Sequence, residues 1–132
     1  MVFNVDYIST RDHSRTPATF TDILLGGLAP DGGLYLPAEY PQLSDSQLTA
    51  WRHLLAEKGY AAVAAEVLKL FVDDIPAEDL EAIAARAYTT PKFAHEEIVP
   101  VTELEDGLYI GHLSEGPTAA FKDMAMQLLG EL

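Results

Sequence analysis

The sequence predicts an α/β protein that is mostly helical, with short strands and one β-hairpin. Three observations support this fold class. Residues 43–88 carry apolar side chains at helical spacing, the segments 2–8 and 98–113 are rich in β-branched and aromatic residues, and a glycine-rich turn lies at 29–37. With 132 residues, 48% of them hydrophobic, the chain can form one domain with a core or part of a larger one.

The N-terminal elements are predicted to be short. Residues 2–8 alternate in the manner of a strand, through Val2, Val5, Tyr7 and Ile8. A polar loop follows over 9–17, and Thr19 or Thr21 can cap a short helix. The apolar side chains of that helix are Phe20, Ile23, Leu24 and Leu28. The turn at 29–37 contains Pro-Asp-Gly-Gly, which permits a tight reversal with a positive φ.

The middle of the chain, 43–88, is predicted to be helical. Ser44 or Asp45 would cap a first helix, and Gly59 would end it in the left-handed conformation. The stretch 61–73 is apolar almost all round, so we expect it to be well buried. A further helix follows, with an apolar stripe formed by Leu80, Ile83, Ala84 and Ala87.

After Pro91 the apolar spacing changes from that of a helix to that of strands. Residues 98–104 and 108–113 are predicted to be two strands joined by a Glu-Asp-Gly turn, which is a β-hairpin. A Gly-Pro loop then leads into a helix that begins near Phe121. Because the sequence stops within two residues of Gly130, inside or just after this helix, we expect the 132 residues to be the front of a longer protein.

The charge excludes several classes of partner. Asp and Glu number 21 against 8 Lys and Arg, which gives a formal net charge of −13. The few cations form no basic stripe for a nucleic-acid backbone, and an anionic membrane surface would repel the chain. No apolar run reaches the roughly 18 residues of a spanning helix, and the N-terminus has no apolar leader. We therefore expect a cytoplasmic protein without nucleic-acid or membrane partners.

Metal and nucleotide motifs are absent from the sequence. There is no cysteine, which removes disulfides, thiolate zinc sites and cysteine nucleophiles. The four histidines show no i, i+4 spacing and the acidic residues show no calcium-loop pattern, so we expect no metal site. The glycine motifs of dinucleotide sites, P-loops and hydrolase elbows are also missing.

The segment 112–123, HLSEGPTAAFKD, is the strongest candidate for chemistry. A Gly-Pro loop leads directly into a helix whose first turn is predicted to contain Lys122. A cation at the positive end of a helix is electrostatically unfavourable, and the loop after a strand is a common ligand site. A lysine in such a place suits Schiff-base chemistry, in which the neutral amine attacks a carbonyl. From the residues alone, a surface lysine paired with Asp123 remains the favoured alternative.

A second cluster is formed by Ser9, Thr10 and Arg11. Two hydroxyl groups beside a guanidinium can contact an anion through charge-assisted hydrogen bonds. The same residues equally describe a turn at the end of a strand with an arginine in solvent, and the residues alone favour that interpretation.

Four segments, in order along the chain, resemble the N-terminal part of the threonine synthase family. They are YISTR at 7–11, GGLAPDGGLYLP at 26–37, FVDDIP at 71–76 and EGPTAAFKD at 115–123. The family consists of pyridoxal-phosphate enzymes of the tryptophan-synthase-β fold type, also called fold type II. The resemblance spans nearly the whole chain. It implies an N-terminal helical domain with a short leading strand at 1–92 and the truncated start of the cofactor-binding catalytic domain at 93–132.

The resemblance also implies a reaction and a site. Lys122 would hold pyridoxal 5'-phosphate as a Schiff base and would act as the general base. The substrate would be O-phospho-L-homoserine, which reacts with water to give L-threonine and phosphate. Thr118 would contact the substrate, and Ser9, Thr10 and Arg11 would line or brace the site. Where members of the family often carry histidine before Gly-Pro-Thr, this chain has Glu115, so no histidine role transfers to that position.

Two alternatives remain beside this interpretation. The segments that would bind the cofactor's phosphate and pyridine nitrogen lie beyond Leu132, so we expect the 132 residues alone to be inactive. The chain would then be part of the enzyme, or it would be a non-catalytic acidic helical interaction module or a relic of that enzyme. Such a fragment is expected to self-associate through exposed apolar surface. A serine or threonine dehydratase of the same fold type is a third interpretation, disfavoured by the glycine turn and the Ser-Thr-Arg cluster.

Overall fold

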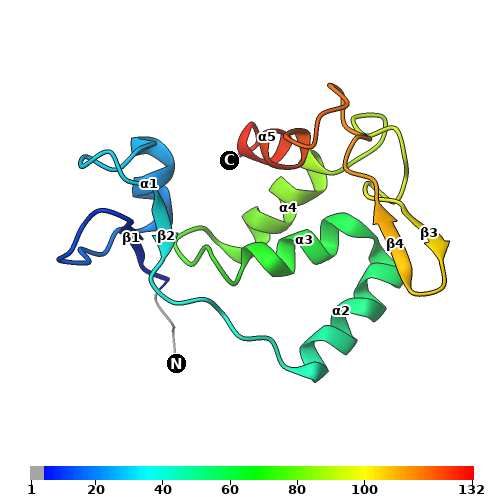
Figure 1. Ribbon diagram of the computed structural model, residues 1–132, viewed down its shortest axis with the longest axis horizontal. Coiled ribbons are helices and arrows are strands. Elements are labelled where there is room, and N and C mark those ends of the chain that lie inside the picture. The colour runs from blue at the N-terminus through cyan, green and yellow to red at the C-terminus, as the bar shows by residue number, and fades with distance from the viewer. Residues whose placement is uncertain (1–4) are drawn as a thin grey trace.

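A computed structural model describes residues 5–132 and confirms a mixed helical and strand architecture with two short antiparallel strand pairs (Figure 1). In chain order the elements are β1 Tyr7–Ser9, α1 Phe20–Gly26, β2 Tyr35–Pro37, α2 Asp45–Lys58, α3 Tyr60–Leu68, α4 Ala77–Ala87, β3 Val101–Glu105, β4 Leu108–Gly111 and α5 Asp123–Leu129. The strands β1 and β2 form one small part of the molecule with α1, while α2, α3 and α4 follow one another in the other part.

The predicted N-terminal strand is shorter than the sequence suggests. Within the described residues β1 begins at Tyr7, and the predicted start at Val2 lies outside them. Its partner β2 is antiparallel, with Ile8 opposite Leu36. The helix α1 begins after Thr19, whose side chain accepts a hydrogen bond from an amide of the first turn, as predicted. It ends at Gly26, so Leu28 is not helical.

Hydrogen bonds join this N-terminal part to the helices. The hydroxyl of buried Tyr7 donates to the carbonyl of Phe71 at 2.6 Å. The Asp74 carboxylate accepts from both the amide and the hydroxyl of Thr21, at 2.8 and 2.6 Å. Asp73 similarly accepts from the amide of Val5 at 2.8 Å. The acidic pair after α3 therefore fixes the N-terminal part against the helical part.

The helix α2 is capped and ended as predicted. Ser44 and Gln47 form a reciprocal capping box, in which each side chain accepts a hydrogen bond from the backbone amide of the other residue. Gly59 ends the helix with φ of +79°, a conformation that disfavours any side chain. These two signals are local in sequence, which is why they could be identified without tertiary information.

The prediction that 61–73 is well buried is wrong for most of the segment. Only Ala65 and Val72 are buried, and Val67 is 38% exposed. The helix α3 packs against α2 and α4, and most of its residues are half-buried. The stripe predicted on α4 is confirmed, because all four of its members are buried: Leu80, Ile83, Ala84 and Ala87.

The predicted hairpin is confirmed, although its strands are shorter than expected. Strands β3 and β4 are antiparallel and joined by a turn in which Gly107 has φ of +78°. Ile98 is not part of β3. It has φ of +64° and is buried, so its side chain anchors the loop before the strand. Every residue of both strands is exposed, which leaves both faces of the hairpin uncovered within residues 5–132.

The C-terminal helix is tied to α4 and the segment after it. The hydroxyl of Tyr88 donates to the carbonyl of Met124 at 2.7 Å. Glu131 forms ion pairs with Arg86 at 2.7 Å and with Lys92 at 3.1 Å. These contacts cross the predicted domain boundary at 92/93, and that boundary stays a prediction.

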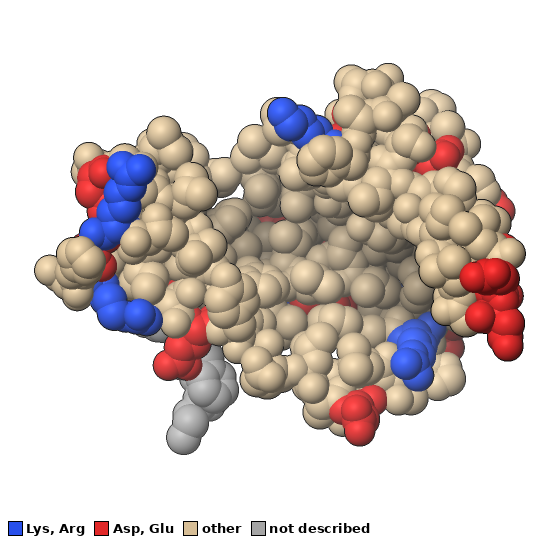
Figure 2. Space-filling view, in the orientation of Figure 1, with Lys and Arg blue, Asp and Glu red and all other residues tan. Residues whose placement is uncertain are grey.

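Figure 2 shows a recess near the centre of this face, over the helical part, with walls formed mainly by residues other than Lys, Arg, Asp and Glu. Throughout residues 5–132, no helix is both long enough and apolar enough to cross a membrane.

The stability of the chain is expected to fall between pH 10 and 12. Burial raises the pKa of Tyr88 from about 10 to about 12, with a smaller effect of the neighbouring Tyr60. The folded state therefore holds the phenol proton more tightly than the unfolded state, so this contribution is complete below pH 10 and is lost as the pH rises to 12. Urea unfolding across this range should show a shallower loss of stability for Tyr88→Phe. Equal pH slopes for the two proteins would contradict the prediction.

Candidate active-site loop and its lysine

The loop between β4 and α5 is organised by a buried carboxylate. Asp123 is only 3% exposed, and its Oδ2 accepts hydrogen bonds from the backbone amide and the hydroxyl of Thr118, at 2.8 and 2.9 Å. Ala119 has φ of +55°, and its amide donates to the carbonyl of Gly116 at 3.0 Å. The chain therefore turns tightly before α5, with the carboxylate inside the turn.

Only glycine fits at position 116, because the backbone there lies against the Asp123 side chain. A Cβ atom placed on Gly116 would overlap the Cβ of Asp123 and lie 2.6 Å from its Oδ2. Both contacts would be closer than van der Waals radii allow. The Asp123 side chain cannot move away easily, because its carboxylate is held by its hydrogen bonds to Thr118. Glycine at this position thus allows the backbone of the loop to lie directly against the carboxylate.

Lys122 is the residue immediately before α5. The prediction that it lies within the first helical turn is off by one position, because the helix begins at Asp123. Its backbone is already helical, with φ of −58°, and its carbonyl accepts from the amides of Ala125 and Met126 at 3.1 and 2.9 Å. The side chain is exposed. Lys122 therefore presents an amino group from a well-defined backbone position.

Lys122 lies at the surface, as the alternative interpretation held, but its predicted pairing with Asp123 is wrong. Among the described residues, no ion pair joins these two side chains, and the Asp123 carboxylate is turned toward Thr118. The reason is geometric, because consecutive residues at the start of a helix point in different directions.

The Ser-Thr-Arg cluster packs against the glycine-rich turn. The buried Ser9 hydroxyl donates to the Asp31 carboxylate at 2.8 Å, and the same carboxylate accepts from the amide of Gly33 at 2.8 Å. The Thr10 hydroxyl accepts from the amide of Leu34 at 3.1 Å. The guanidinium of Arg11 lies 3.5 Å from the carbonyl of Asp31. We call Ser9, Thr10, Arg11, Asp31 and Gly33 the glycine-turn cluster.

Within residues 5–132, no hydrogen bond or ion pair connects the glycine-turn cluster to the loop that carries Lys122. The structure therefore brings Thr118 together with the segment around Lys122, and it brings Ser9, Thr10 and Arg11 together with Asp31. Sequence reasoning missed both organising aspartates. Asp31 could have been found from its place before two glycines in a turn, whereas Asp123 was assigned only as a partner of the lysine.

Gly33→Ala is expected to destabilise the chain by about 1–3 kcal/mol, as other overpacking substitutions do. Its Cβ would overlap the Ser9 hydroxyl and lie 2.9 Å from Asp31 Oδ1, with Thr10 Oγ1 at 3.1 Å. Gly26→Ala is the matched control, because a Cβ there meets no atom within 4 Å. Urea unfolding of the two variants should separate them clearly. Equal free energies of unfolding for the two variants would contradict the prediction, because the residues around Gly33 would then accommodate the extra methyl group without loss of stability.

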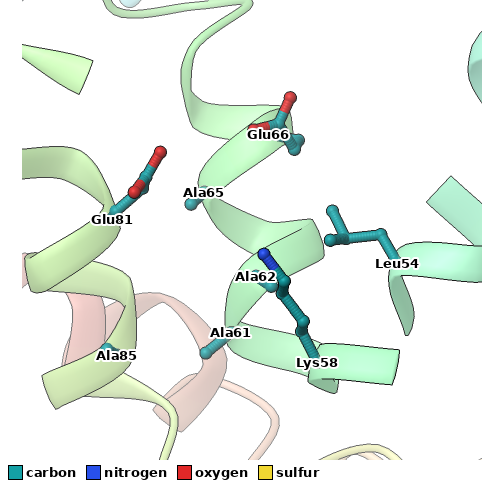
Figure 3. A pocket seen from close by; sticks show the side chains of 8 residues that line it. All are labelled: Leu54, Lys58, Ala61, Ala62, Ala65, Glu66, Glu81 and Ala85. Carbon is teal, nitrogen blue, oxygen red and sulfur yellow. The ribbon is translucent and has the colours of Figure 1, made fainter. Parts of the chain in front are cut away.

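A separate cavity of about 280 Å³ lies between α2, α3 and α4 (Figure 3). Its walls are small alanines and Leu54, with Lys58, Glu66 and Glu81 around them. The two carboxylates bind Lys69, each at 2.6 Å. Lys69, which follows α3, is thereby connected to α4, so the two carboxylates of the cavity have a structural role. None of the predicted site residues lines it.

Comparison with known proteins decides the family. A family described as "Threonine synthase N terminus" matches residues 6–88. The chain belongs to the threonine synthase family. It is 79% identical over 128 residues to the threonine synthase of Corynebacterium glutamicum, which covers 97% of this chain and 27% of that relative. It is 52% identical over 134 residues to the threonine synthase of Methylobacillus glycogenes, again 27% of the relative's length.

Solved threonine synthases share the fold. The PLP-bound threonine synthase of Brucella melitensis aligns with a TM-score of 0.84 and 43% identity, over 97% of this chain and 26% of that one. The yeast enzyme aligns with a TM-score of 0.82 and 30% identity, over 97% of this chain and 25% of that one. The chain thus spans about a quarter of the length of the relatives it matches. Its architecture is that of the N-terminal region of a threonine synthase.

Proposed function

We propose that the chain works as the N-terminal part of a threonine synthase that converts O-phospho-L-homoserine and water to L-threonine and phosphate. The observation that carries the proposal is the exposed Lys122, which extends from the ordered loop before α5 in a chain of this family. The reaction belongs to the complete enzyme. Because the chain spans about a quarter of its relatives, we expect the 132 residues alone to be inactive.

The residues present fit pyridoxal phosphate at one point, which is the amine of Lys122. Its side chain is exposed, and no ion pair to a residue of 5–132 occupies its amino group. A primary amine in this state can form a Schiff base with an aldehyde. When bound, the cofactor withdraws electrons from the carbons of an attached amino acid.

In this proposal Lys122 has two tasks. Its Nζ would hold the cofactor between turnovers, and once freed by the substrate amine it would accept the proton from Cα of the substrate and return one there at the end. Thr118 lies four residues before it on the same loop, with an exposed side chain. Ser9, Thr10 and Arg11 would brace the site through the glycine-rich turn. Residues 1–92 would form the helical domain and 93–132 the start of the catalytic domain.

The proposed reaction is tested with the complete gene product that contains this chain. We expect purified protein to release threonine and phosphate from O-phospho-L-homoserine in equal amounts, and to contain pyridoxal phosphate. Its intact mass should be several times that of 132 residues. A complete gene product of 132 residues without turnover would favour the acidic interaction module. Release of ammonia from serine or threonine, without turnover of the phosphorylated substrate, would favour a dehydratase.

The cellular location follows from the same proposal. A cysteine-free chain has no requirement for an oxidising compartment. We propose that the enzyme acts in the cytoplasm, which fractionation of the host with an antibody against the chain would test.

The isolated 132 residues are expected to self-associate. Seven large apolar side chains of β3, β4 and α5 are between 42% and 61% exposed, and Phe121 is 69% exposed. A surface of this kind is normally covered in a folded protein. Sedimentation velocity should show species larger than a monomer at micromolar concentration, and Ile110→Lys should reduce them. A monodisperse monomer would contradict this prediction.

A further inference from the structure

The Asp123 carboxylate lies in the interior, whereas the side chains of Lys122 and Thr118 beside it are exposed. A carboxylate loses favourable hydration when it is buried, so its position must be justified by the bonds it makes. Its Oδ2 accepts from the amide and from the hydroxyl of Thr118, five residues earlier in the chain. The carboxylate thus closes a short ring between the middle of the loop and the start of α5.

The backbone is fixed on both sides of this ring. On the loop side, Gly116 lies so close to Asp123 that no side chain fits between them. On the helix side, the amide of Asp123 donates to the carbonyl of Ala120 at 3.0 Å, and the carbonyl of Lys122 accepts from two amides of α5. Lys122 therefore lies between the loop at Thr118 and the helix α5, and the hydrogen bonds of Asp123 hold these two segments together.

We infer that Asp123 is a positioning residue for Lys122, and that the Thr118 hydroxyl donates its proton to Asp123 and not to a substrate. A hydroxyl has one proton to donate, and that of Thr118 is directed to Asp123 Oδ2 at 2.9 Å. Thr118 therefore keeps only acceptor lone pairs for a substrate. The inference rests on the proposed function for its kinetic consequence, because a misplacement of about 1 Å can reduce turnover by about 10²-fold.

The first test needs neither cofactor nor substrate. In the complete gene product, hydrogen exchange at the amide of Thr118 should be about tenfold faster in Asp123→Ala, because its acceptor is lost. Thr118→Ser keeps both donors and should exchange like the wild type. Asp106→Asn is the matched control, since Asp106 is exposed in the hairpin turn, where either residue is suitable.

The second test separates positioning from simple stability. In folded protein with cofactor bound, Asp123→Ala should lower kcat on the order of tenfold to 10²-fold with little change in KM. The circular dichroism of the bound cofactor, per cofactor, should fall because its attachment point is less fixed. Thr118→Val should have an intermediate effect on both readouts, because the amide donor remains, and Thr118→Ser, which keeps the hydroxyl donor, should lower kcat and the circular dichroism less than Thr118→Val does.

Two results would overturn the inference. One is wild-type exchange at Thr118 in a folded Asp123→Ala variant, and the other is a wild-type kcat and circular dichroism in that variant. If Asp123→Ala does not fold, a wild-type kcat and circular dichroism in Thr118→Val, which loses the hydroxyl donor, would overturn the inference. Absence of turnover in the wild type would refute the proposed function instead, while the exchange measurement still tests the role of Asp123.

Discussion

Lys122→Ala in the complete gene product is expected to lose at least about 10³-fold in turnover of O-phospho-L-homoserine, within the range that general acid–base groups contribute. It should also lose the absorbance of a Schiff-base-bound cofactor. The reason is that the exposed amine of Lys122 is the group proposed both to hold pyridoxal phosphate and to move the proton at Cα. The steady-state rate and the cofactor spectrum measure the two effects separately.

Two control variants make this prediction specific. Lys58→Ala removes another exposed lysine, on α2, and should retain wild-type turnover. Lys122→Arg keeps the positive charge but offers no amine suited to a Schiff base, so it should be as inactive as Lys122→Ala. Wild-type turnover in either Lys122 variant would remove this lysine from the site.

Phe93→Ala is expected to reduce the free energy of unfolding of the 132-residue chain by about 3–5 kcal/mol. Phe93 is fully buried, and its ring centroid lies 5.9 Å from that of Tyr88. The next residue, Ala94, donates its amide to the carbonyl of Glu115 at 2.8 Å, so the cavity would open beside the loop that carries Lys122. Urea unfolding measures the loss directly.

Phe121→Ala is the matched control for this change. It removes the same side chain from a position that is 69% exposed within the chain, so it should alter stability by no more than about 0.5 kcal/mol. If both variants lost the same amount, the core around Phe93 would not have the arrangement described above.

The parts of the fold that could be predicted depend on local signals. The cap at Ser44 with Gln47, the end of α2 at Gly59 and the hairpin turn at Gly107 each depend on hydrogen bonds or a φ angle within a few residues. The stripe on α4 was equally visible, because a helix with one apolar face has one obvious way to pack. Resemblance to a family then supplied the N-terminal region as a whole.

The parts that could not be predicted depend on distant neighbours. The burial of α3 was overestimated because an apolar sequence does not reveal how many elements will surround it, and Val67 remains 38% exposed. Ile98 was assigned to a strand by residue type, although its side chain turns inward from a left-handed position. The preference of a residue type for strands reflects how its side chain packs on a sheet more than an intrinsic preference of its backbone, so residue type alone did not place Ile98 correctly.

The candidate site shows the same division. The sequence identified Lys122 and Thr118 as members of one segment, and the structure places them on one loop. It did not reveal that Asp123 points inward to Thr118, because the direction of a side chain depends on the turn at Ala119. The Ser-Thr-Arg cluster was considered for anion binding, whereas Ser9 is occupied by Asp31 in the structure. Its part in the site stays a prediction.

Borohydride reduction of the complete gene product, followed by peptide mass mapping, tests the central claim most directly. Reduction converts a Schiff base into a stable bond, so the labelled lysine identifies the residue that holds the cofactor. We predict that the pyridoxyl group is found on the peptide that contains Lys122, and on no peptide that contains Lys58, Lys69 or Lys92. A label on a different lysine, with Lys122 unmodified, would contradict the account.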